Sequence, residues 1–204
     1  MTASDRDPRL GPWAFEMDIP TRWLDNDQYG HLNNSAYYLI ADSIVNTYLI
    51  THCGIEPFQH SPPPASSGAA SSSGGASSAD VIGLVISSSA NYYAPTSFPS
   101  NLRVKLRAVH LGRSSVRYEV GVFEQPLKSM LLSTATGSKD ASLTVQRAEE
   151  VGGDKGGTKA AVVTQATHVF VDRASRRPVK AMPDQLRRGL ERLVVGAPSP
   201  AAKL

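Results

Sequence analysis

The sequence predicts an α+β fold in which a curled antiparallel β-sheet wraps around one long central helix. The first observation is the stretch from Ser35 to His52, which is apolar at helical spacing and carries a single charged residue, Asp42. The second is a series of later segments that alternate with a period of two and are joined by short turns, as antiparallel strands are. A lone apolar helix followed by such strands needs a sheet that curls around it.

Length and composition predict a single domain without a nucleic-acid partner. The chain has 204 residues, of which 41% are hydrophobic and 19% charged, so a sizeable core can form. A net charge of +3 suits an anionic small ligand, but it lacks the clustered basic surface of a nucleic-acid binder. One cysteine excludes an intrachain disulfide and a cysteine-rich zinc site. We expect a domain over residues 13–194, after a flexible N-terminus over residues 1–12.

Two segments of low complexity interrupt the domain. Residues 61–79 contain only Ser, Pro, Ala and Gly, and residues 146–159 are polar and rich in glycine. Such segments have little apolar surface to offset the entropy of ordering, so we expect flexible surface insertions. A flexible tail over residues 195–204 is expected for the same reason. The stretch from Leu127 to Val145 fits either a further strand or part of an insertion.

The first strand and the helix have clear boundaries. From Trp13 to Arg22 apolar and acidic residues alternate, which is typical of a half-buried strand. Asn33 and Asn34 are good N-caps for the helix, and Cys53-Gly54 supplies its stop. Because the helix is apolar nearly all round, we expect it to be buried nearly all round, with Cys53 as a small buried hydrophobe.

The remaining elements follow the first insertion. Alternation or β-rich composition predicts strands, and a proline followed by a leucine stripe predicts a last helix. The expected strands are Val81–Tyr93, Leu102–Ala108, Val116–Val122 and Ala160–Asp172, and the expected helix begins at Pro183 and ends at Leu193. The sheet would keep one open edge, which a second copy of the chain could cover.

A dense polar cluster lies between the first strand and the long helix, from Asp25 to Asn34. The N-terminus of a helix presents unpaired N–H groups and the positive end of the macrodipole, which can stabilise charge developing on a substrate carbonyl. A carboxylate beside it can attack that carbonyl or take a proton from water. The alternative is that Asp25 and Asp27 only cap turns and that His31 only hydrogen-bonds the backbone.

The cluster resembles the signature of a known family. Asp25-x-Asp27-x-x-Gly30-His31-x-Asn33-Asn34-x-x-Tyr37, preceded by Arg22, looks like that of hotdog-fold thioesterases of the 4-hydroxybenzoyl-CoA thioesterase type. The segment His168–Arg173 followed by Arg177-Pro178-Val179 is similar to that family's last strand and the turn after it, and Tyr92-x-x-Pro95 with Leu102-x-Val104 to its middle strands. The resemblance covers Trp13–Phe58 and Val81–Leu190.

The resemblance implies a hotdog fold, a homodimer or homotetramer with active sites at the dimer interface, and hydrolysis of an acyl-CoA without metal or other cofactor. Asp27 falls on the catalytic carboxylate, as nucleophile or general base, and Asp25 on a structural position. Backbone donors from Gly30 to Asn34 would polarise the thioester carbonyl. His31 would either assist or orient the loop, and Asn34 stands where some members carry Tyr or His. The implied substrate-binding positions are Gly30, Leu32, Asn33 and Tyr37.

Basic side chains on and between the expected strands Leu102–Ala108 and Val116–Val122 leave two interpretations open. They could meet the phosphates of coenzyme A, with Arg113 as the residue we select for substrate binding, or they could form a solvated sheet face. These residues are Arg103, Lys105, Arg107, Arg113 and Arg117.

Other functions remain to be distinguished. A hotdog enzyme could act on acyl-carrier-protein thioesters, and a non-catalytic hotdog protein could bind acyl-CoA while keeping Asp27 as a structural cap. No Gly-x-Ser-x-Gly elbow, Gly-x-Gly-x-x-Gly loop or paired metal-ligand spacing occurs in the sequence. The chain ends in Ala202-Lys203-Leu204, a variant of the Ser-Lys-Leu peroxisomal address, so we expect a peroxisomal import receptor as partner, and otherwise a cytoplasmic location.

Overall fold

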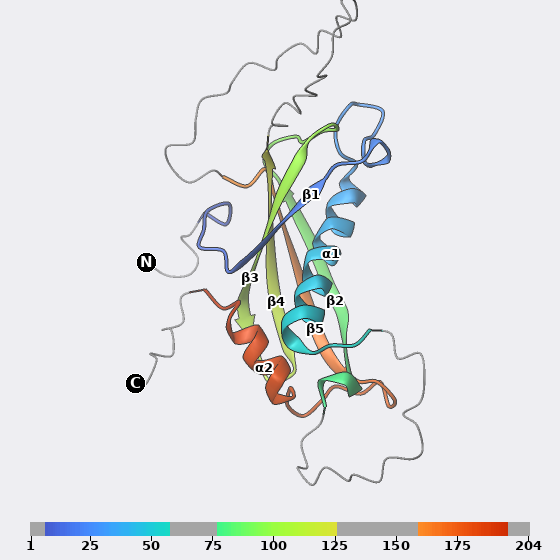
Figure 1. The fold of residues 1–204 in the computed structure, drawn as a ribbon, viewed down its shortest axis with the longest axis vertical. Helices are drawn as coiled ribbons and strands as arrows, with labels where there is room; N and C mark the ends of the chain where they lie inside the picture. The colour runs from blue at the N-terminus through green and yellow to red at the C-terminus, as the bar shows by residue number, and fades with distance from the viewer. Residues whose placement is uncertain (1–6, 58–76, 126–158, 196–204) are drawn as a thin grey trace, which may run out of the picture.

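A computed structural model describes residues 7–57, 77–125 and 159–195 of the chain. Five strands form one antiparallel sheet in the order β1-β3-β4-β5-β2, and the long helix α1 lies against one face of it (Figure 1). The predicted α+β class is therefore confirmed. The elements are β1 (Phe15–Pro20), α1 (Asn34–Cys53), β2 (Val81–Tyr92), β3 (Asn101–Leu111), β4 (Ser115–Gln125), β5 (Val162–Asp172) and α2 (Asp184–Glu191).

The core lies between α1 and the sheet. On β3 the fully buried residues Leu102, Val104 and Leu106 alternate with Arg103 and Lys105, so the predicted apolar parity faces the helix. The same face of the sheet supplies further apolar side chains from β4 and β5, and α1 supplies one from every turn of its buried side. Burial of this apolar surface is the dominant favourable contribution to folding.

Local sequence sets the ends of α1. The Asn33 side chain accepts a hydrogen bond from the Ser35 N–H at 3.0 Å, which is the predicted N-cap. Gly54 has φ 67° and donates its N–H to the Leu49 carbonyl, so the helix ends in a left-handed residue. Cys53 is buried, and burial raises the pKa of its thiol to about 12, which keeps the thiol protonated and inert.

The expectation that α1 is buried nearly all round is wrong for the single chain. Tyr38, Leu39 and Ile50 are exposed on its outer side, while α1 contacts β1, β3 and β5. At the edge of the sheet, β2 also exposes apolar side chains, including Val85 and Ile86. One sheet of this size covers one side of the helix and leaves the other side uncovered.

The second helix covers the C-terminal end of α1. Leu186, Leu190 and Leu193 are fully buried, which confirms the predicted stripe, although α2 itself ends at Glu191. The Tyr48 hydroxyl donates to the Gly189 carbonyl at 2.7 Å. A side chain at Gly189 would meet the Cys53 sulfur at 2.5 Å, so close approach of the two helices needs a glycine there.

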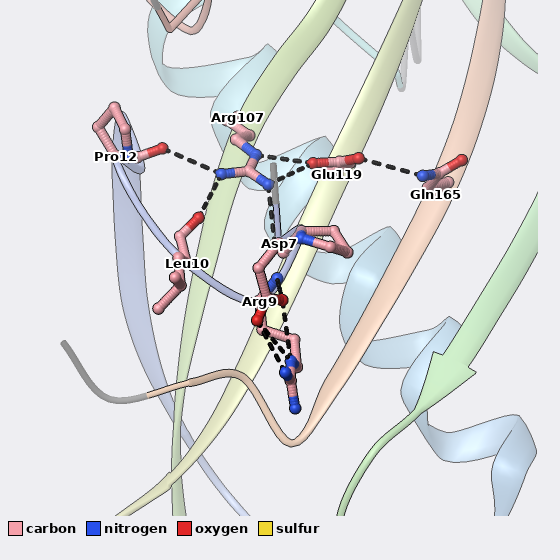
Figure 2. Close-up of polar contacts among 8 residues, drawn as sticks. Asp7, Arg9, Leu10, Pro12, Arg107, Glu119 and Gln165 are labelled. Atoms are coloured by element: carbon pink, nitrogen blue, oxygen red, sulfur yellow. Dashed lines mark hydrogen bonds and ion pairs between the residues drawn. The ribbon is translucent and has the colours of Figure 1, made fainter. Parts of the chain in front are cut away.

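Residues 7–13 lie on the outer face of the sheet, opposite α1, and we call them the N-terminal strap. Arg107 holds the strap by donating to the carbonyls of Leu10 at 2.7 Å and Pro8 at 2.8 Å (Figure 2). Its guanidinium also lies 4.1 Å from the centre of the Trp13 ring. Residues 7–12, part of the N-terminus expected to be flexible, are therefore bound to the sheet.

Arg107 is part of a buried polar network. Its Nε donates to Glu119 at 2.7 Å, and the other oxygen of Glu119 accepts from Gln165 at 3.1 Å (Figure 2). Arg107 is only 2% exposed, which corrects both interpretations that the sequence left open for this residue, a phosphate ligand and a solvated sheet face. The strap covers the guanidinium, and no signal in the local alternation of β3 predicts that cover.

Several predictions lie outside the described residues: the stretch Leu127–Val145, nearly all of residues 61–79 and 146–159, and the tail after residue 195. Residues 77–79 are described, and Ser78–Asp80 form a short 3-10 helix that leads into β2. Among the described residues, no helix is both long and apolar enough to cross a membrane.

Candidate active site

The polar cluster forms a closed loop between β1 and α1. Its first turn is fixed by Arg22, the N-cap of the short 3-10 helix Trp23–Asp25, and by Asp25, the last residue of that helix. The Arg22 guanidinium donates to Asp25 at 2.7 and 3.1 Å, and the Arg22 backbone N–H donates to the same carboxylate at 2.7 Å. This side-chain pairing holds the pKa of Asp25 below its usual range. Asp25 is buried, so its environment suits the structural position that the resemblance assigns to it.

Asp27 organises the rest of the loop. Its Oδ1 accepts the backbone N–H groups of Tyr29 at 2.8 Å and His31 at 3.2 Å, and its own N–H donates to the His31 carbonyl at 2.7 Å. Gly30 allows this tight turn because its φ is +83°, a conformation that favours glycine. Asp27 is half-buried, and within the described part of the chain both hydrogen bonds to its carboxylate go to Oδ1 and none to Oδ2. One oxygen is therefore fixed and the other is available.

The backbone donors predicted from Gly30 to Asn34 are mostly engaged inside the protein. The N–H groups of Leu32 and Asn33 donate to Thr96 and Asp25 carbonyls at 2.8 and 2.7 Å, and that of Gly30 approaches the Asp27 carbonyl at 3.4 Å. His31 donates to Asp27 as described above. Among the described residues, this leaves the Asn34 N–H, the first of α1, as the backbone donor in that stretch that a substrate could use. The prediction of a five-residue donor set is thus narrowed to one position.

A second loop, between β2 and β3, supports the first. The Tyr37 hydroxyl and the Thr96 hydroxyl are 2.9 Å apart, and the Asn26 side chain accepts the Phe98 N–H at 3.0 Å. Asn26 and Thr96 have supporting roles that sequence reasoning missed. Asn26 stands inside the polar cluster, so its position in the sequence could have indicated a role in the site. Thr96 lies 59 residues from its partner Tyr37, and nothing in the sequence around it indicates that contact.

Tyr37 connects the loop with the sheet. Burial is the main cause that raises the pKa of its phenol, and the negative charge of Asp27 acts weakly in the same direction. The Tyr37 ring also packs edge-to-face on Tyr92 at the end of β2, with ring centres 5.5 Å apart.

Exposed apolar side chains surround the loop: Tyr29 is 87% exposed, and Trp23 and Leu24 are also largely exposed. Such a surface fits contact with a ligand or another protein.

The other predicted site residues are distributed as follows. The structure brings His31, Asn33 and Asn34 together with Asp27 on the exposed side of the loop, whereas Leu32 points inward and is buried. Arg113 does not join them. It lies in the turn between β3 and β4, where it donates to the Lys180 carbonyl at 3.0 Å, at the opposite end of β3 from the Asp27 loop (Figure 1).

Comparisons with known proteins agree with this architecture. The family model described as the thioesterase superfamily matches residues 29–130. The crystal structure of the PA5185 protein from Pseudomonas aeruginosa is 34% identical, covers 91% of this chain and 95% of its own, and superposes with a TM-score of 0.63.

Two further solved structures share the fold at lower identity. A thioesterase superfamily protein from Jannaschia sp. CCS1 is 13% identical, with coverage of 91% and 87% and a TM-score of 0.58. The SAV2348 protein from Staphylococcus aureus, solved in complex with CoA, is 10% identical, with coverage of 91% and 86% and a TM-score of 0.57. None of the curated proteins matches the chain significantly.

A long helix against a five-stranded antiparallel sheet, with an acidic loop at the helix N-terminus, defines a hotdog-fold protein. The chain belongs to the thioesterase superfamily.

Proposed function

We propose that this protein is an acyl-CoA thioesterase that converts R-CO-S-CoA and water into R-COOH and CoA. The observation that carries the proposal is the Asp27 carboxylate, in which two backbone N–H groups hold one oxygen while the other stays available next to the first turn of α1. Membership of the superfamily supports thioester hydrolysis as the reaction class.

The geometry suggests a division of roles. The Oδ2 atom of Asp27 either attacks the thioester carbonyl carbon or removes a proton from the attacking water. The Asn34 N–H and the positive end of the α1 dipole stabilise the negative charge that develops on the carbonyl oxygen. Collapse of that charge expels the CoA thiolate, which takes up a proton. Where water is the nucleophile, this step yields R-COOH directly. Where Asp27 is the nucleophile, it leaves a mixed anhydride between the acyl group and Asp27, which water then hydrolyses to R-COOH and the free carboxylate. His31 and the Asn34 side chain are exposed beside the loop and can contact the substrate.

Release of free thiol from a panel of acyl-CoAs tests the proposal. Purified full-length protein is expected to release CoA from at least one straight-chain or aromatic thioester in a saturable manner, and the signal should depend on Asp27. Saturable binding without release would instead support a non-catalytic acyl-CoA-binding protein. Release that occurs only from acyl-carrier-protein thioesters would reassign the substrate.

We also propose that two copies pair through β2. This strand forms one edge of the sheet and exposes Leu84, Val85 and Ile86, and an apolar edge of this kind favours pairing with another strand. Antiparallel pairing about a two-fold axis would bring the Arg113 end of one copy near the Asp27 end of the other. Sedimentation of the wild type should give a dimer, and Ile86→Lys should shift it toward monomer. A monomeric wild type would contradict the proposal.

The C-terminal tripeptide supports a location in peroxisomes. A fluorescent protein fused to the N-terminus is expected to give a punctate peroxisomal pattern, which should become diffuse when Ala202, Lys203 and Leu204 are deleted. A fusion placed after Leu204 would mask the same signal and serves as the matched control. A diffuse pattern for the first fusion would favour the cytoplasm.

A further inference from the structure

Thr96 contacts both halves of the proposed reaction centre from a single buried position. Its carbonyl accepts the N–H of Leu32 at 2.8 Å, and its hydroxyl lies 2.9 Å from the hydroxyl of Tyr37. Leu32 belongs to the loop that carries Asp27, whereas Tyr37 belongs to α1. Thr96 is only 1% exposed, so its side chain can affect a substrate only through the residues that it contacts.

The backbone contact of Thr96 holds the loop that carries Asp27. Leu32 follows His31, which is bonded to Asp27 twice: the His31 N–H donates to Oδ1 at 3.2 Å, and the His31 carbonyl accepts the Asp27 N–H at 2.7 Å. A bridge between Asn26 and Leu32 closes the same loop at its base. The Thr96 carbonyl is thus bonded to the residue next to the one that orients the carboxylate.

The side-chain contact of Thr96 holds the first turn of α1. Tyr37 lies one turn after Asn34, so the two residues are on the same side of the helix. Because the backbone of a helical turn is hydrogen-bonded to itself, fixing the Tyr37 phenol also limits movement of the turn that presents the Asn34 N–H. The Tyr37 ring is buried in the core, which leaves its hydroxyl directed at Thr96.

The loop that carries Thr96 is itself fixed to the sheet. The Ser97 N–H donates to the carboxylate of Glu124, near the end of β4, at 3.0 Å. The Ser100 N–H donates to the Thr21 hydroxyl at 2.8 Å, and that hydroxyl donates to the Ser100 carbonyl at 2.9 Å. Thr96 is therefore a fixed point from which both halves of the reaction centre are held.

We propose that Thr96 is a positioning residue, whose two hydrogen bonds set the distance between the Asp27 carboxylate and the Asn34 N–H. The inference rests on the proposed thioesterase function, in which the carboxylate provides the base or nucleophile and the N–H stabilises the oxyanion. Both groups must meet one carbonyl group at the same time. A misplacement of about 1 Å in such an arrangement can cost about a hundredfold in rate.

The test removes the hydroxyl contact from either side. Thr96→Val keeps the shape of the side chain and the backbone bond to Leu32, and Tyr37→Phe removes the same contact from the helix. With whichever of hexanoyl-CoA, hexadecanoyl-CoA and benzoyl-CoA the wild type hydrolyses fastest, each variant should lower kcat by about tenfold or more. In Thr96→Val, KM should change by less than about twofold, because the buried side chain does not meet the substrate. Thr96→Ser retains the hydroxyl and should restore kcat.

Two controls separate positioning from stability. Tyr48→Phe removes a buried phenol hydroxyl from the other end of α1, where it donates to the Gly189 carbonyl at 2.7 Å, and should lower thermal stability without lowering kcat. The double variant Thr96→Val/Tyr37→Phe leaves neither hydroxyl buried alone, so it should be more stable than either single variant. Its kcat should nevertheless stay low, because the link between loop and helix is still missing. Recovery of kcat together with stability would overturn the inference.

Hydrogen exchange separates this inference from the proposed function. In full-length Thr96→Val, NMR should show exchange of the His31 and Leu32 amides accelerated by about fivefold, the factor expected for one lost hydrogen bond. Exchange at Gly54, whose N–H is bonded at the far end of α1, should not change. If the wild type releases no thiol from any of the three acyl-CoAs but this acceleration occurs, the proposed function fails and the positioning of the Asp27 loop by Thr96 stands. Unchanged exchange at His31 and Leu32, or a wild-type kcat in Thr96→Val, would contradict the role of Thr96 even in an active enzyme.

Discussion

Replacing Asp27 with Asn is expected to lower kcat/KM for acyl-CoA hydrolysis by about three orders of magnitude while the protein keeps its fold. The amide oxygen of Asn can still accept the Tyr29 and His31 N–H groups that Oδ1 of Asp27 accepts, so the loop retains its hydrogen bonds. The substitution removes the charge and basicity of Oδ2, which general base or nucleophilic catalysis needs. Thiol release under steady-state conditions gives kcat/KM, and circular dichroism and thermal unfolding monitor the fold.

Asp25→Asn is the matched control for this prediction. Asp25 is two residues away and equally acidic, but its carboxylate is bound by Arg22 on both oxygens. We expect this variant to lose stability through the weakened loop and to keep more activity than Asp27→Asn when folded. An Asp27→Asn protein with a wild-type hydrolysis rate would remove the basis of the proposed mechanism, whatever the behaviour of Asp25→Asn.

Replacing Arg107 with Met should lower the free energy of unfolding by about 3–5 kcal/mol. The variant leaves the buried carboxylate of Glu119 without its cation and the strap carbonyls of Pro8 and Leu10 without their donor. Removing one partner of a buried ion pair costs this much because the remaining charge stays buried and uncompensated. Urea unfolding followed by tryptophan fluorescence is a suitable measurement, since Trp13 packs on the guanidinium.

Arg103 offers a control on the same strand and the same face of the sheet. It pairs with Asp18 at 3.0 Å, but both side chains are more than one-third exposed. Arg103→Met should therefore cost at most about 1 kcal/mol. Combining Arg107→Met with Glu119→Leu should recover part of the loss, because no buried charge then remains. Equal losses for the Arg103 and Arg107 variants would show that burial of the network has no energetic consequence.

Much of the fold could be predicted from periodicity. Alternation predicted the strands, and the Ser35–His52 stretch predicted α1 to within one residue at each end. This is because an element with one buried face carries apolar residues at the period of a helix or a strand. The burial of Arg107 could not be predicted, since its cover comes from the strap about 100 residues earlier. Alternation describes which face a residue occupies but carries no information on what covers that face.

The candidate site was predictable to a similar degree. The polar cluster left turn capping open, and Asp27 was selected because it falls on the catalytic acid of the family signature that the segment resembles, so its role stays a prediction. The number of usable backbone donors was not predictable, because Leu32 and Asn33 donate to carbonyls whose positions only the folded loops fix.

The separation between the strap and its anchor has a consequence for synthesis of the chain. Leu10 precedes Arg107 by 97 positions, so during synthesis the strap has no docking surface until β3 and β4 have also emerged from the ribosome. Their attachment is therefore expected to be among the last steps of maturation, with Trp13 remaining in water until then.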